Sequence, residues 1–274
     1  MTEASFLIAA AVGYLLASVA YGAHLLLRQP ALATAGRLAA VFAVLMHTVA
    51  IGVECLQTHQ TPFTTPAETL SASAWAIALA YLALELLRRP RPTALGAVAL
   101  PAAFLCLFAG AFLHQARPAA SAAPLLNSNL ISLHILAILF AFGLLVLAFG
   151  CAALYIAQDR ILKRKHLSGG LFGKLPPLAS LDELAFTLVA YAFPLLTIGL
   201  AAGVVEALTS SLRGVWGADP MVLTSVVTWL VYGLYLGLHT VAHWRGPRVN
   251  YLLLGGLLAA LVTYFIPPSM HRFG

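Results

Sequence analysis

Charge is scarce in this chain. Only 9% of its 274 residues are Asp, Glu, Lys or Arg, whereas 61% are hydrophobic, and the mean hydropathy is +0.93. A soluble domain usually carries about 25% charged residues. The composition therefore excludes an ordinary soluble globular protein and indicates a polytopic membrane protein.

Cysteine is also scarce and is not arranged for chemistry. Cys55, Cys106 and Cys151 lie far apart, and the chain has no C-x-x-C and no C-x-x-C-H motif. This argues against a thiol oxidoreductase of the usual type and against a c-type cytochrome, and we expect the three side chains to be small buried hydrophobic groups. A basic segment at the N-terminus is missing too, so we expect the first apolar run to be a membrane span rather than a signal peptide.

Eight apolar runs are long enough to cross a bilayer, which takes roughly 20 residues per helix. We therefore predict an all-α fold, a polytopic membrane helix bundle formed by a single domain, residues 1–274. Two helix starts show the capping-box pattern, Thr65-Pro66-Ala67-Glu68 and Ser180-Leu181-Asp182-Glu183. Residues 158–182 are expected to form a basic cytoplasmic loop. The predicted spans lie near residues 5–27, 34–54, 67–87, 94–113, 129–157, 183–209, 220–243 and 250–267.

The basic residues fall mainly on one side of the predicted membrane. With the N-terminus outside the cytoplasm, twelve Lys and Arg residues lie on the cytoplasmic side, and Arg117, Arg213 and Arg272 lie on the other. Because cytoplasmic loops carry an excess of Lys and Arg, this count predicts that both termini are outside the cytoplasm. We expect a multi-pass protein of the bacterial cytoplasmic (inner) membrane. The pI of about 9.5 then reflects topology and does not indicate nucleic-acid binding.

Four of the nine histidines need an explanation. His47 and His239 fall within predicted spans, whereas His134 and His271 lie at outer span ends. An ionisable side chain at depth in a bilayer is costly, so we expect His47 and His239 to face the bundle interior with partners. One interpretation is that each is a structural residue, hydrogen-bonded between helices. Neutral imidazole is also a common ligand of haem iron, so both interpretations stay open.

The seventh predicted span carries a stripe of aromatic and histidine side chains. They recur every three or four residues and so share one helix face, either for a structural role or for a ligand. The stripe consists of Trp229, Tyr232, Leu236, His239 and His243.

The segment before this span also has features of a ligand site. Asp219 followed by Pro220 is typical of a helix start. Haem would suit the region, because its flat apolar macrocycle can stack on rings such as Trp216, Trp229 and Tyr232. A zinc or copper site is less supported, since no ligands cluster at short spacing.

Four stretches of the second half combine into a known pattern. They are SLHILAILFAFGLLVLAFGCAALYIAQDRILKRK from Ser132, PPLASLDELAF from Pro176, GVWGADP from Gly214 and WLVYGLYLGLHTVAHWRGPR from Trp229. Residues 130–274 thereby resemble cytochrome c assembly proteins of the CcsA type, in particular the short eight-span HemX-like and YpjD-like branch. The first half matches that family in topology only.

The resemblance implies two levels of haem binding. In the family, a tryptophan-rich external motif binds haem between two external histidines, and two further histidines lie in the membrane. His134 and His271 match the external pair, His239 matches one intramembrane histidine, and His47 is a candidate for the other on topology alone. The external motif maps onto Trp216, Gly217, Asp219 and Pro220, with Ala218 at its second tryptophan and Met221 at a usual lysine.

We therefore predict a haem-handling membrane protein that is not an enzyme and that carries or presents haem for cytochrome c assembly. No nucleophile–base pair, phosphate loop or paired carboxylate indicates catalysis. The expected partners are haem, membrane lipid and other cytochrome c assembly proteins or haem-synthesis enzymes, and no nucleic acid. The alternatives are a HemX-like regulator acting through residues 158–182, or a membrane scaffold or transporter with structural histidines. The predicted haem-binding residues are His134, His239, His271, His47, Trp216, Asp219 and Trp229, with the four histidines as iron ligands.

Overall fold

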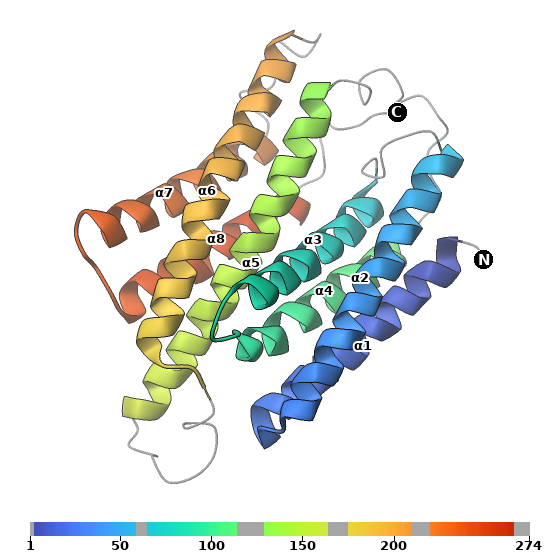
Figure 1. Ribbon diagram of the computed structural model, residues 1–274. Helices are drawn as coiled ribbons and strands as arrows, with labels where there is room; N and C mark the ends of the chain where they lie inside the picture. The colour runs from blue at the N-terminus through green and yellow to red at the C-terminus, as the bar shows by residue number, and fades with distance from the viewer. Residues whose placement is uncertain (1–2, 59–64, 114–128, 164–174, 210–219, 266–274) are drawn as a thin grey trace. The chain divides into compact units, whose positions relative to one another are not determined.

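The computed structural model describes residues 3–58, 65–113, 129–163, 175–209 and 220–265 (Figure 1). Within these residues every regular element is an α-helix, and the predicted all-α fold is confirmed. The eight helices are α1 Glu3–Leu27, α2 Pro30–Thr58, α3 Pro66–Leu87, α4 Thr93–Leu113, α5 Asn129–Lys163, α6 Leu178–Thr209, α7 Pro220–Thr240 and α8 Pro247–Phe265.

Length and hydropathy identify the membrane-spanning helices. α1 to α7 are each long and apolar enough to cross a bilayer. The apolar part of α8 over Pro247–Val262 is shorter than the roughly 20 residues that a crossing takes. A multi-pass membrane protein follows, while the position of each terminus relative to the membrane stays a prediction.

Local sequence signals account for most helix starts. α2, α3, α7 and α8 each begin at a proline, whose missing N–H is not needed in the first turn. Thr65 caps α3, because its Oγ1 accepts a hydrogen bond from the N–H of Glu68 at 3.2 Å. The second predicted capping box is wrong: α6 begins at Leu178, directly after two prolines, so Ser180 lies inside the helix. Because α5 also continues to Lys163, both helices extend into the region expected to be a loop.

The chain divides into two compact units. The first comprises residues 1–115 and 157–180, and the second comprises residues 116–156 and 181–274. In the first unit, α1 packs against α2 and α4, and α3 packs against α2 and α4. Small residues allow this close approach: a Cβ on Gly13 would lie 2.8 Å from the Cβ of Ala43. The prediction of a single membrane domain stays a prediction.

The second unit contains most of α5 and α6, with α7 and α8. α5 and α6 meet where Gly199 passes the side chain of Ile138, and α7 contacts α8 where Gly256 passes the ring of Tyr232. Both units leave large apolar side chains exposed along their helices, as expected of surfaces that face lipid. Examples are Leu16, Leu38 and Phe42 in the first unit and Leu223, Leu230 and Leu234 in the second.

Candidate functional site

His239 is the centre of a polar cluster at the end of α7. This residue is 3% exposed and lies in the last turn of the helix. Nε2 lies 2.9 Å from Nη1 of Arg245 and 3.3 Å from Oδ2 of Asp182. Arg245 also donates to Oδ2 of Asp182 at 3.2 Å, and Asn250 of α8 donates to Oδ1 at 3.4 Å. The cluster therefore ties α6, α7 and α8 together.

Whether Nε2 of His239 donates or accepts follows from the chemistry of the two side chains beside it, Arg245 and Asp182. A guanidinium only donates hydrogen bonds, and a carboxylate only accepts them. In the neutral imidazole, Nε2 accepts from Arg245, so the proton is on Nδ1 and the Nε2 lone pair points at the guanidinium. Asp182 cannot share that lone pair, and its carboxylate instead holds Arg245 and Asn250.

Aromatic side chains fix the plane of the imidazole. Phe186, one turn after Asp182 on α6, stacks on His239 with ring centroids 4.3 Å apart and an interplanar angle of 12°. Tyr235 of α7 is 1% exposed, and its ring centroid lies 5.8 Å from that of His239. The imidazole is thus held on its face by a ring and at its Nε2 edge by Arg245.

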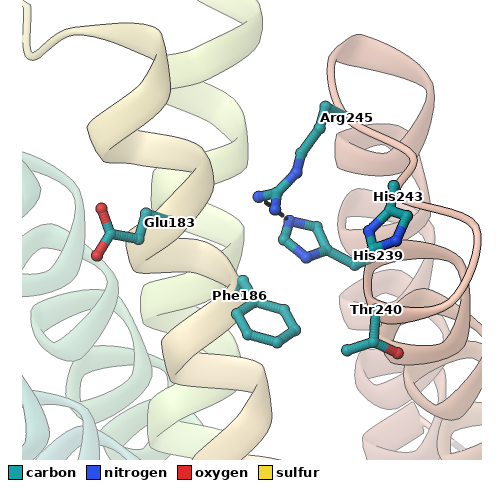
Figure 2. A pocket seen from close by; sticks show the side chains of 6 residues that line it. All are labelled: Glu183, Phe186, His239, Thr240, His243 and Arg245. Carbon is teal, nitrogen blue, oxygen red and sulfur yellow. Dashed lines mark hydrogen bonds between the residues drawn. The ribbon is translucent and has the colours of Figure 1, made fainter.

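A pocket opens beside this imidazole. Its volume is about 410 Å³, within the range of small-molecule sites. Figure 2 shows Arg245 reaching from the segment after α7 toward the His239 ring, with Phe186 on the facing helix. The lining residues are Glu183, Phe186, His239, Thr240, His243 and Arg245.

The predicted stripe on the seventh span is correct up to His239 and wrong beyond it. Tyr232 is 1% exposed, and Trp229 donates from Nε1 to Oγ1 of Thr197 at 2.9 Å and stacks on Phe193 of α6. α7 ends at Thr240, however, so His243 is not on the helix. Its φ of 51° is left-handed, and its side chain is exposed at the edge of the pocket.

His134 is held near the start of α5 by the backbone of α6. Its Nδ1 lies 2.7 Å from the carbonyl oxygen of Gly199. Because a carbonyl only accepts, Nδ1 carries the proton, and the neutral ring has its lone pair on Nε2. Metal-ligating histidines commonly have this arrangement, in which one nitrogen is oriented by a carbonyl and the other is a ligand.

His47 lies in α2 and is fully buried. Its Nδ1 is 3.2 Å from the hydroxyl of Tyr14 in α1, and its Nε2 is 2.9 Å from Oγ of Ser71 in α3. The expectation that His47 and His239 face the interior with partners is confirmed. In His47 both ring nitrogens are used to join three helices.

Several predicted site residues lie outside the described part of the chain. These are His271, Trp216 and Asp219, together with Ala218 of the same motif. Of the described candidates, His47 belongs to the first unit, and His134, Trp229 and His239 belong to the second.

The sequence interpretation missed Asp182, Arg245 and Asn250 as partners of His239. The capping-box pattern accounts for Asp182 and the loop charge count accounts for Arg245, so neither pattern indicates a contact with His239. It also missed Glu85, a fully buried side chain in α3 that accepts from the hydroxyl of Tyr21 at 2.5 Å and from Nη2 of Arg37 at 3.0 Å. The available signal was an acidic residue inside an apolar span, which requires a partner.

Comparison with known proteins gives a consistent match. Residues 63–273 match the family described as Cytochrome C assembly protein. The chain is 26% identical over 254 residues to the cytochrome c biogenesis protein CcsA of Guillardia theta, covering 85% of this chain and 83% of the relative. It is 24% identical over 301 residues to CcsA of Gloeobacter violaceus, covering 90% and 88%, and 25% identical over 250 residues to CcsA of Porphyra purpurea, covering 76% of each. The HemX-like and YpjD-like branch stays a prediction, but the match covers most of the chain, which belongs to the cytochrome c assembly protein family.

Proposed function

We propose that this protein binds haem through histidines and carries or presents it for cytochrome c assembly, without catalysing a bond change itself. Membership of the family and the names of the relatives support a role in cytochrome c biogenesis. The observation that carries the proposal is the His239 site, where a buried imidazole, stacked on Phe186, lies at the edge of a pocket that also contains a cationic side chain.

The residues at this pocket fit the chemistry of haem. A porphyrin supplies four nitrogens to its iron, so one or two protein ligands suffice, and imidazole is a common one. Within the described residues no group of three or more His, Cys, Asp or Glu could hold a metal ion. An aromatic face such as Phe186 suits an apolar macrocycle, and Arg245 suits a propionate. Haem would be the cargo of this protein, and the chain's own residues bind and orient it.

We propose two binding levels along the chain. In this proposal His239 and His47 are the ligands within the membrane, and His134 and His271 are the external ligands, with Trp216, Asp219 and Trp229 as further haem-binding residues. The Nδ1–H tautomer of His134, with its lone pair on Nε2, supports a ligand role. Ligation by His47 requires it to give up either Tyr14 or Ser71.

The proposed setting is the bacterial cytoplasmic membrane, with both termini outside the cytoplasm. The charge distribution over the loops supports this orientation. Membrane lipid and other cytochrome c assembly proteins are the proposed partners, since haem presentation is one step of that assembly.

The first test is the absorption spectrum of the protein purified in mild detergent from cells supplied with haem precursor. We expect a Soret band and sharp visible bands in the reduced state, weakened or shifted in His239→Ala and in His134→Ala. His24→Ala is the matched control, because this imidazole bonds the carbonyl of Gln29 at a helix end. An unchanged spectrum and haem content in both test variants would show that neither histidine is a ligand.

A further inference from the structure

The lone pair that a metal would use on His239 already has a partner. Nε2 accepts a hydrogen bond from Arg245 at 2.9 Å, so the nitrogen cannot bind iron until Arg245 moves away. The stacking of Phe186 on the ring and the burial of His239 keep the imidazole itself in place. Access to Nε2 therefore depends on Arg245.

Arg245 and Asp182 differ in their freedom to move. The side chain of Asp182 is 8% exposed and also binds Asn250, whereas the side chain of Arg245 is 59% exposed. Arg245 lies between α7 and α8, next to Gly246, whose φ of 98° is left-handed. Asp182 is thus a fixed anchor, and the guanidinium lies at the open edge of the pocket.

The pocket offers Arg245 an alternative partner only if the ligand is anionic. Guanidinium binds carboxylates in charge-assisted, often bidentate pairs that are stronger than its bond to a neutral imidazole. Haem carries two carboxylates, so a haem entering this pocket brings a better acceptor for Arg245 than Nε2.

We propose that Arg245 is a displaceable cap on His239, which covers Nε2 and leaves it for a carboxylate of an incoming tetrapyrrole. The inference rests on the proposed function, and it assigns to Arg245 both the protection of the ligand nitrogen and the selection of an anionic cargo. Asp182 keeps the guanidinium near the pocket in both arrangements.

The first experiment measures protection of the nitrogen without any tetrapyrrole. Haem-free protein in phosphatidylcholine nanodiscs is treated with diethyl pyrocarbonate, and the modification rate of His239 is read by peptide mass spectrometry. We expect Arg245→Gln to react about tenfold faster than the unchanged protein, as for the loss of one charge-assisted hydrogen bond. Arg248→Gln, an exposed arginine three residues on, is the matched control and should react at the original rate.

The second experiment measures recognition of the carboxylates without iron. Metal-free protoporphyrin IX and its dimethyl ester are titrated by fluorescence, so that no His239–iron bond contributes to binding. Arg245→Gln should weaken protoporphyrin IX about tenfold and leave the ester unchanged. Circular dichroism and gel filtration confirm that the variant is folded.

Each result decides the proposal independently of haem ligation. Equal reactivity of His239 in Arg245→Gln and the unchanged protein overturns the cap, and so does equal loss of affinity for the acid and the ester. Phosphatidylglycerol is added in a further arm: a rise in His239 reactivity without porphyrin would assign Arg245 to a lipid phosphate and also overturn the cap. If both experiments support the cap but His239→Ala leaves the haem spectrum unchanged, the proposed haem ligation by His239 is wrong and the role of Arg245 stands.

Discussion

The imidazole of His134 lies directly against a glycine. A Cβ built on Gly203 of α6 would lie 2.7 Å from Nδ1 and 2.9 Å from Cε1 of His134. The ring cannot give way without losing its hydrogen bond to the Gly199 carbonyl. Gly203 thus allows α6 to approach the candidate ligand closely.

Gly203→Ala is therefore expected to destabilise the protein by about 1–3 kcal/mol, the usual cost of overpacking. The measurement is thermal unfolding in detergent followed by circular dichroism, together with haem content. Gly237→Ala in α7 is the control, because a Cβ there meets nothing within 4 Å, and alanine is about 1 kcal/mol better than glycine in a helix. Equal stability of the two variants would contradict the close packing around His134.

At single residues, the sequence predicted the histidines better than their partners. The cost of a buried ionisable group indicated that His47 and His239 have interior partners. The identity of those partners depends on distant helices, since Asp182 precedes His239 by 57 positions, and no local pattern encodes that contact. Hydroxyls such as Tyr14 and Ser71 are equally unremarkable in sequence, and their role appears only when three helices are packed.

Among the helices, α1, α2 and α3 are joined by a buried ion pair. The carboxylate of Glu85 in α3 accepts from Tyr21 in α1 and from both Nε and Nη2 of Arg37 in α2. Glu85 is fully buried, and the Arg37 side chain is 20% exposed. Removing one partner leaves the other charge without compensation in a region of low dielectric constant.

Glu85→Gln should accordingly lower the free energy of unfolding by about 3 kcal/mol. Arg37→Gln should cost less, since Tyr21 still donates to the carboxylate. In the double variant we expect part of the loss to be recovered, with a coupling of about 1–3 kcal/mol from a double-mutant cycle in denaturant titrations. Strictly additive single effects would show that the pair contributes no interaction of its own.

The sequence predicts which segments are helices better than it predicts where each helix ends. Each predicted span corresponds to a helix, because roughly 20 consecutive apolar residues have few other solutions in a bilayer. The ends of α5 and α6 differ from prediction because a helix continues past the apolar run wherever polar residues such as Arg160 and Lys163 are good helix formers. The end of α7 depends on the left-handed backbone at His243 and on the bond from the N–H of Trp244 to the carbonyl of Leu238.

For the whole molecule, hydropathy and charge constrain different properties. Hydropathy establishes a multi-pass helical protein, and seven helices satisfy it in the described residues. The predicted orientation depends on the distribution of Lys and Arg over the loops, and it decides on which side of the membrane the pocket at the end of α7 lies. Because Arg28, Arg88 and Arg245 all follow odd-numbered helices, the count predicts that the pocket lies at the cytoplasmic end of α7.

α2 offers a direct test of this orientation. Its 29 residues span about 43 Å, longer than the hydrocarbon core, so its two ends lie on opposite sides of the membrane. With the native cysteines replaced, Gln57→Cys should react with a membrane-impermeant maleimide on intact cells, and Gln29→Cys only after permeabilisation. Both positions are exposed, so reactivity reports sidedness rather than burial. Labelling of Gln29→Cys alone on intact cells would contradict the predicted orientation and would place the His239 pocket towards the outside of the cytoplasm.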